Sequence, residues 1–177
     1  IVDRLRKEFD IVHLCGKGKV DEELMGKDGY LQYEYIREEL PDLFALADIV
    51  ISRAGANAIC ELLALKKPNL LIPLSAKASR GDQILNAASF EKQGFSLVLQ
   101  EEDITDDVLF DTVTKLYQEK DAFAQTMAEH TQKDAITIIT ELIEEVRLKR
   151  DEEEVAEEAE GEEIEEASEE AEAEEVE

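Results

Sequence analysis

The chain has few of the residues that build metal and disulfide sites. Its 177 residues include only two cysteines, Cys15 and Cys60, and two histidines, His13 and His130. Two isolated cysteines cannot form the disulfide framework of a small secreted domain, and no second ligand-type side chain stands beside them at the spacing of a zinc site. We therefore expect no metal and no cofactor, and we expect both cysteines to be small buried apolar residues.

Positive charge and long apolar runs are also scarce. The chain has 19 Lys and Arg against 45 Asp and Glu, a net charge of −26. A protein that binds nucleic acid needs a basic surface to displace counterions, so this composition argues against nucleic acid as a partner. No apolar run approaches the roughly 20 residues that a membrane-spanning helix requires.

Much of the negative charge is concentrated at one end of the chain. Residues 151–177 contain 17 Asp and Glu and no Lys or Arg, which leaves 28 acidic and 19 basic residues up to Arg150, a net of −9. A block of like charge with few apolar residues cannot bury enough surface to fold alone. We expect a folded domain at residues 1–149 and a disordered Glu/Ala-rich tail at 150–177. Because the chain begins with Ile1 and not Met, we also expect a longer parent protein.

Short apolar segments alternate with helical patterns along residues 1–149. The predicted strands are 10–15, 30–36, 48–52, 69–73 and 95–99, and the predicted helices are 1–9, 40–47, 55–65, 82–93, 105–117, 122–130 and 134–149. Most of these strands are apolar on both sides, which is typical of parallel strands covered on both faces. The order predicts an α/β fold, a Rossmann-like open parallel sheet with helices on both faces.

The turn after the predicted strand 48–52 is the most informative segment. Residues 53–61, RAGANAICE, carry no bulk in the turn and then open a helix. A ligand can approach such a backbone, and the first N–H groups and the dipole of the helix favour a phosphate. Glu61 follows within reach of a ribose or sugar hydroxyl. The segment predicts a nucleotide or nucleotide-sugar site, although small residues here would also serve close packing of the helix on the sheet.

A second polar cluster opens the helix predicted at 82–93. Asp82 and Asn86 share one face of that helix, and Gln83 is adjacent to Asp82. Carboxylate and amide groups can bind several sugar hydroxyls, each of which donates or accepts. The alternative is that Asp82 only complements the helix N-terminus. Both clusters follow strands, at the carboxyl edge of the sheet where ligands bind in such folds.

Taken in order, these segments resemble the carboxyl-terminal half of the MurG transferases of glycosyltransferase family 28. The matching segments are HLCGKG at 13–18, EYI at 34–36, ADIVISRAGANAICE at 47–61, LIP at 71–73 and DQILNA at 82–87. The resemblance covers roughly residues 1–148 and leaves out the acidic tail. It implies the donor-binding half of an inverting GT-B enzyme that moves N-acetylglucosamine from UDP-N-acetylglucosamine to lipid I, forming lipid II for peptidoglycan.

The resemblance implies a role for each substrate-binding residue. The backbone of Ile36 would read the uracil, and Glu61 would bind the ribose hydroxyls. The diphosphate would lie on the turn and helix start, with the residues Arg53, Gly55, Ala56 and Asn57 around it.

The N-acetylglucosamine would meet Asp82 and Gln83, with Asn86 beside them. The chain departs from the family at Ala58, where a Thr is frequent, and at Asp82, where a Gln is frequent. The first departure removes a possible hydroxyl contact, and the second keeps a group that binds hydroxyls.

Other parts of the family pattern are expected ahead of Ile1. These are a Gly-Gly-Ser loop that grips the diphosphate and an amino-terminal domain that holds the catalytic base, binds lipid I and faces the membrane surface. We therefore assign no catalytic residue in this chain and expect it to be inactive as a transferase alone. The resemblance places the protein in the bacterial cytoplasm, peripheral on the inner face of the cell membrane.

Three alternatives stay open on the residues. The chain could be a nucleotide-sugar-binding subunit that works with a separate membrane-bound acceptor subunit. It could be a UDP-sugar epimerase of the same architecture, which needs carboxylates and a histidine in the cleft, and His13 is the only candidate. It could also be a non-catalytic acidic interaction protein.

Overall fold

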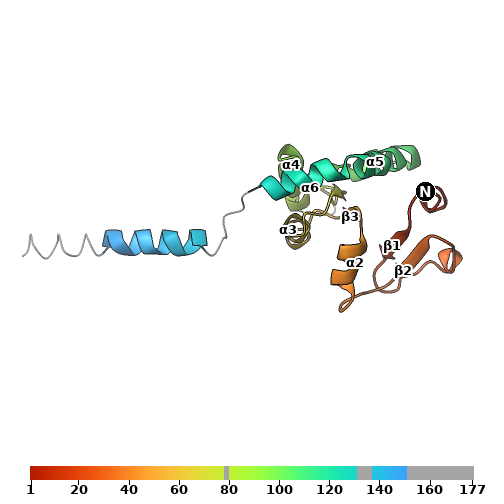
Figure 1. Ribbon diagram of the computed structural model, residues 1–177, viewed down its shortest axis with the longest axis horizontal. Helices are drawn as coiled ribbons and strands as arrows, with labels where there is room; N and C mark the ends of the chain where they lie inside the picture. The colour runs from red at the N-terminus through yellow and green to blue at the C-terminus, as the bar shows by residue number, and fades with distance from the viewer. Residues whose placement is uncertain (78–79, 131–136, 151–177) are drawn as a thin grey trace, which may run out of the picture. The chain divides into compact units, whose positions relative to one another are not determined.

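The computed structural model describes residues 1–77, 80–130 and 137–150 (Figure 1). The chain divides into two units, Ile1–His130 and Thr131–Glu177. The described part of the second unit, residues 137–150, is helical, in agreement with the amphipathic helix expected at 134–149. The acidic tail from residue 151 on lies outside the described residues. The domain boundary expected at residue 149 stays a prediction.

The first unit alternates strands and helices. In chain order its elements are α1 (Val2–Leu5), β1 (Ile11–Leu14), the 3-10 helix η1 (Glu22–Leu24), β2 (Tyr30–Tyr33), α2 (Leu40–Leu46), β3 (Val50–Ser52), α3 (Ala56–Ala64), β4 (Asn69–Leu71), α4 (Asp82–Lys92), β5 (Ser96–Val98), the 3-10 helix η2 (Glu101–Asp103), α5 (Asp106–Gln118) and α6 (Lys120–Glu129). Each predicted strand and helix of this unit is present, most of them shorter by one or more residues at an end.

All strands that the structure describes run parallel to their neighbours. They form a two-stranded sheet, β1-β2, and a three-stranded sheet in the order β3-β4-β5. In the second sheet Asn69 lies opposite Val50 on one side and Ser96 on the other. The predicted α/β class with parallel strands is confirmed. Within the described residues, however, hydrogen bonds divide the strands into two sheets, where we expected one continuous sheet.

Helices cover both faces of the three-stranded sheet. Leu70 and Leu71 are neighbours on β4, point to opposite faces, and are both 0% exposed. Leu70 packs with residues of α1 and α5, and Leu71 packs with residues of α3, α4 and α6. Fully burying one such side chain stabilises a fold by about 1.5–3 kcal/mol. The predicted helical layers on both faces are therefore confirmed for this sheet.

A buried polar pair fixes the amino-terminal ends of β4 and β5. Asn69 and Ser96 are 1% and 2% exposed. The Ser96 hydroxyl donates to Asn69 Oδ1 over 2.7 Å, and Asn69 Nδ2 donates to the carbonyl oxygens of Lys67 and Phe95. Because each polar atom has a partner, burying this pair does not carry the cost of an unsatisfied group.

One face of the two-stranded sheet is exposed. Val12 lies opposite Leu31 and Leu14 lies opposite Tyr33, so the four side chains share a face, and they are 39%, 56%, 46% and 42% exposed. The helical cover expected on both faces is therefore missing from this face of the β1-β2 sheet, and Ile51 in the middle of β3 is also exposed. The reason is that the helical side chains gather around β4, and the β1-β2 sheet contributes mainly Ile11 and Tyr30 to the interior.

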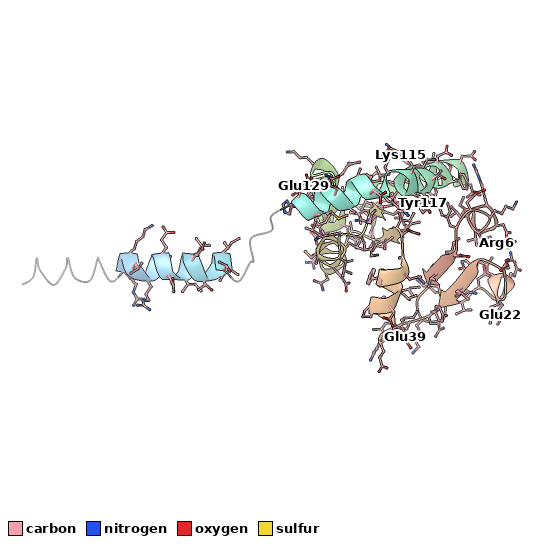
Figure 2. The ribbon with its side chains drawn as sticks, in the orientation of Figure 1. Arg6, Glu22, Glu39, Lys115, Tyr117 and Glu129 are labelled. Carbon is pink, nitrogen blue, oxygen red and sulfur yellow. The ribbon has the colours of Figure 1, made fainter. Side chains whose placement is uncertain are left out.

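The end of the α1 segment is fixed to the helical layer through aromatic contacts. Tyr117, labelled on α5 in Figure 2, meets the ring of Phe9 edge-on with ring centroids 5.4 Å apart. The Lys120 ammonium lies 4.3 Å from the centroid of the same Tyr117 ring. These contacts place the start of β1 beside α5.

The expectation that both cysteines are buried is wrong. Cys15 is half-buried and Cys60 is exposed. Cys60 lies on α3, where Ile59, Leu62 and Leu63 take the positions that face the core. Cys60 therefore falls on the outer side of the helix.

Candidate functional site

The carboxyl ends of β3, β4 and β5 meet at one edge of the three-stranded sheet. The segments that leave this edge contain Arg53 after β3, residues 72–75 after β4 and Glu101 after β5. Parallel α/β sheets bind ligands beyond this edge. The two polar clusters predicted from the sequence, on α3 and α4, both begin here.

The first turn of α3 is open. Gly55 precedes the helix in an extended conformation, with φ −69° and ψ 142°, and no side chain caps the helix. Ala56 and Asn57 in this first turn are exposed, as is Glu61 one turn further on. The N–H groups at a helix start have no intrahelical acceptor, so this turn offers donors and a positive dipole end to an anion.

A hydrogen bond joins the α3 turn to α4. Asn86 Nδ2 donates to the carbonyl oxygen of Ala54 over 3.0 Å, and Ala54 itself is 0% exposed. Asn86 therefore fixes the backbone immediately ahead of the open helix turn. The structure brings the two predicted clusters together, although residues 54 and 86 are far apart in the sequence.

The opening of α4 is fixed to the segment after β4. Gly81 precedes α4 with φ +88°, a left-handed conformation that glycine adopts without strain. Gln83 Oε1 accepts a hydrogen bond from the Leu74 backbone N–H over 3.0 Å, while Asp82 beside it is exposed. The Gln83 NH2 group still has donors to offer, and the Asp82 carboxylate is available to hydroxyl groups.

Glu101 is a site residue that the sequence analysis missed. Its Oε1 accepts from Arg53 Nη2 over 2.9 Å, and its Oε2 accepts from the Ser75 N–H over 3.4 Å. The Arg53 hydrogen bond, with a smaller contribution from Ser75, lowers the pKa of the Glu101 carboxyl below its usual value. The signal that could have found it is its place just beyond the predicted strand 95–99, at the edge where the other polar clusters lie.

Ile36 lies beyond the end of the other sheet, after β2. It is half-buried in the segment between β2 and α2, and within the described residues no hydrogen bond or ion pair links it to the α3 and α4 clusters. Nearby, Glu34 accepts from the Gly18 N–H over 2.6 Å, so the ends of β1 and β2 are joined. Gly16 and Gly18 have φ of +89° and +69°, which explains why the turn after β1 requires glycine.

His13 has a partner inside the two-stranded sheet. Its Nδ1 lies 2.8 Å from the Tyr30 hydroxyl, in the middle of β1 and not at the carboxyl edge. The placement gives no support to the epimerase alternative, which needs a histidine among carboxylates. Across the described ranges, no group of three or more His, Cys, Asp or Glu side chains is placed to hold a metal. None of the described helices is long and apolar enough to cross a membrane.

Two similar proteins from bacteria have the same name. The protein is 60% identical over 143 residues to a UDP-N-acetylglucosamine--N-acetylmuramyl-(pentapeptide) pyrophosphoryl-undecaprenol N-acetylglucosamine transferase of Lachnospira eligens, covering 81% of this chain and 40% of the relative. It is 58% identical over 149 residues to the protein of the same description from Lachnoclostridium phytofermentans, covering 84% and 42%. The chain thus spans about two fifths of the length of these curated relatives.

Solved structures share the fold. The crystal structure of MurG from Acinetobacter baumannii superposes with a TM-score of 0.66 at 23% identity, covering 80% of this chain and 43% of that one. The glycosyltransferase of kitacinnamycin gives a TM-score of 0.55 at 22% identity, covering 66% and 29%. A sequence profile of the glycosyltransferase family 28 C-terminal domain matches residues 2–143. The resemblance inferred from the motifs is confirmed, and the chain belongs to glycosyltransferase family 28 through that domain.

Proposed function

We propose that this chain is the donor-binding half of an inverting glycosyltransferase that moves N-acetylglucosamine from UDP-N-acetylglucosamine to lipid I. The observation that carries the proposal is the joined pair of clusters at the edge of β3-β4-β5. An uncapped helix turn suited to a diphosphate lies beside a helix opening that carries a carboxylate and two amides. The 60% identity to the Lachnospira eligens transferase supports the same substrate class.

The diphosphate is assigned to the start of α3. Its negative oxygens would accept from the backbone N–H groups around Gly55, Ala56 and Asn57, at the positive end of the helix dipole. Arg53 lies at the same edge with 49% of its side chain exposed, and it would add a positive charge near the phosphates. As the glycosidic bond to UDP breaks, negative charge grows on the departing diphosphate. Fixed donors stabilise such charge most in the transition state.

The two ends of the donor are assigned to residues on either side of this turn. Glu61, exposed on α3, would accept hydrogen bonds from the ribose hydroxyls, and the backbone of Ile36 would read the uracil. Asp82, Gln83 and Asn86 on α4 would bind the hydroxyls of the sugar. The intramolecular bonds of Gln83 and Asn86 support this assignment because they hold both side chains at the helix opening.

The remaining parts of the reaction are assigned outside this chain. The proposal gives it the orientation of the donor and the stabilisation of the leaving group, and places the catalytic base, lipid I binding and contact with the cytoplasmic face of the membrane in a second domain or subunit. We accordingly expect no turnover of lipid I by the 177-residue chain alone. We also expect the complete enzyme to act at the inner surface of the bacterial cell membrane.

Calorimetric titration of the chain with UDP and with UDP-N-acetylglucosamine tests the proposal. We expect saturable binding of both ligands and weaker binding of ADP, because the uracil contact discriminates between the bases. Absence of binding by both uridine ligands would contradict the proposal and would favour a non-catalytic interaction protein.

A further inference from the structure

Three side chains from different elements hold the backbone that leaves β4. Arg53 Nη1, from the end of β3, donates to the carbonyl oxygen of Ile72 over 3.2 Å. Gln83, from α4, accepts from the Leu74 N–H over 3.0 Å. Glu101, from η2, accepts from the Ser75 N–H over 3.4 Å. Within four residues, three backbone polar groups are therefore fixed by side chains and not by a strand or helix.

Glu101 connects two of these anchors. One of its carboxylate oxygens holds the Ser75 N–H, and the other holds the Arg53 guanidinium at 2.9 Å, which in turn holds the Ile72 carbonyl. Charge-assisted bonds of this kind are stronger than neutral ones. The lowered pKa of the Glu101 carboxyl agrees with an ionised group at neutral pH. The Arg53–Glu101 pair thus joins the carboxyl ends of β3, β4 and β5.

We propose that Glu101 is a positioning residue for donor-sugar specificity, acting with Arg53 to fix residues 72–75 and thereby the opening of α4. This inference rests on the proposed function. Glu101 touches no part of the donor in this account. It sets where Gln83 and Asp82 stand, because Gln83 is bonded to the backbone next to Ser75. Neither residue type nor spacing in the sequence indicates this role.

The test compares two ligands on the intact 177-residue chain. UDP and UDP-N-acetylglucosamine are titrated calorimetrically into the unaltered chain, Glu101→Ala, Glu101→Gln and the matched control Glu102→Gln. Glu102 is the exposed acidic neighbour in η2 with the same charge. For Glu101→Ala we expect the Kd for the UDP sugar to rise about three- to thirtyfold while the Kd for UDP changes less than about twofold.

The variants separate positioning from charge and from folding. Glu101→Gln keeps one acceptor oxygen, so its effect on the UDP sugar is expected to lie between those of the unaltered chain and Glu101→Ala. Glu102→Gln should leave both affinities unchanged. In an Arg53→Ala background, Glu101→Ala should add little to the loss in sugar selectivity, because the two residues act as one unit.

Several outcomes would overturn the inference. An equal loss for UDP and the UDP sugar would show that Glu101 serves the nucleotide or the fold as a whole. Tighter UDP binding by Glu101→Ala would show that the carboxylate competes with the phosphates for Arg53 and Ser75. If the losses in sugar selectivity from Glu101→Ala and Arg53→Ala added fully in the double variant, the two residues would act independently and not as one unit. Failure of the unaltered chain to bind either ligand would instead overturn the proposed function, and this inference with it.

Discussion

The two sheets of the first unit have the same parallel strands and nearly opposite surroundings. On β4 of the three-stranded sheet, Leu70 and Leu71 are fully buried between helical layers. On the two-stranded sheet, Leu31 is 56% exposed and shares its face with Val12, Leu14 and Tyr33, which are exposed as well. The sequence predicts both as strands, β4 from a continuous apolar run and β2 from an alternating pattern. The difference comes from the helices. Figure 1 shows α3, α4, α5 and α6 around the three-stranded sheet, and their apolar side chains pack on it, while one face of the β1-β2 sheet stays exposed.

Most of the proposed donor-binding residues lie at the sheet that is packed between helices. The proposed site lies at the carboxyl edge of the well-packed sheet. It comprises the α3 turn, the opening of α4 and the Arg53–Glu101 pair. A binding geometry is held most closely when its residues stand on elements whose own positions are fixed by packing. Of the proposed donor contacts, only that of Ile36 lies on the less covered side, after β2.

A matched pair of leucine substitutions should show the largest contrast. Leu70→Ala removes a fully buried side chain and leaves a cavity, so it should lower the free energy of unfolding by about 2–5 kcal/mol. Leu31→Ala, on the exposed face, should change it by less than about 1 kcal/mol. Urea unfolding of both variants measures the difference. Equal losses would mean that the β1-β2 face is covered as tightly as β4.

Loss of the Asn69–Ser96 hydrogen bond in the three-stranded sheet should lower the free energy of unfolding more than loss of the His13–Tyr30 hydrogen bond in the two-stranded sheet. Asn69→Ala removes the acceptor of the buried Ser96 hydroxyl and the side-chain donor to two backbone carbonyls, which should cost about 1–3 kcal/mol. Tyr30→Phe removes only the bond to His13, whose exposed ring can turn to water, so the cost should stay below about 1 kcal/mol. Chemical denaturation in the same urea series compares the two. A larger loss of unfolding free energy for Tyr30→Phe than for Asn69→Ala would contradict the expectation that the polar pair of the three-stranded sheet contributes more to stability.

Acid should weaken the fold only slightly through two carboxyls with a lowered pKa, Asp3 on α1 and Glu101 at the edge of the three-stranded sheet. The pKa of Asp3 is lowered by Arg6 and then Lys27, and that of Glu101 is lowered by Arg53 and then Ser75. A lowered folded pKa means that each group adds stability above its unfolded pKa and that this stability is lost as pH falls through the folded value. The pH range in which this stability is lost therefore begins near the ordinary carboxyl pKa values of 3.8 for Asp and 4.5 for Glu, and extends below them.

Thermal unfolding between pH 3 and pH 6 checks this expectation. Asp3→Asn and Glu101→Gln should each show a slightly flatter decline of the midpoint in acid than the unaltered chain, and should differ from it little in slope near neutral pH. Since the Asp3 side chain is 65% exposed and that of Glu101 is 37% exposed, water screens both ion pairs and the effects should be the smallest of the series. A steeper decline in either variant would contradict the assigned sign.

Local signals in the sequence predicted most elements of the fold. Thr is a residue type that caps helices, and Thr105 does so at the start of α5, where its hydroxyl oxygen accepts from the Val108 N–H over 3.2 Å. Glycine commonly ends a helix, and Gly94 follows α4 with φ +75°. Such features depend on a few neighbouring residues, so a single sequence contains them. The two polar clusters could be found in the same way, because small residues and amides at strand ends are visible in the chain.

The misses share a physical cause. Whether Ile51, Leu31 or Cys60 is covered depends on which helix packs there, and an apolar run does not encode its distant partner. The roles of Glu101 and Asn86 depend on hydrogen bonds to backbone atoms 26 and 32 residues away. The sequence placed Asn86 near a sugar, but only the fold shows that it also holds Ala54.

The most direct test of the account is the pattern of ligand affinity across Glu61→Ala and Asp82→Ala. Calorimetric titration with UDP and with UDP-N-acetylglucosamine should show Glu61→Ala weakening both ligands about ten- to hundredfold, since the lost acceptor is the carboxylate that we propose binds the ribose. Asp82→Ala should weaken the UDP sugar by a similar factor and leave UDP nearly unchanged. If both variants weakened the two ligands equally, the assignment of Glu61 to the ribose and of Asp82 to the sugar would be wrong. If neither variant weakened either ligand, the donor site would not lie at this edge of the β3-β4-β5 sheet.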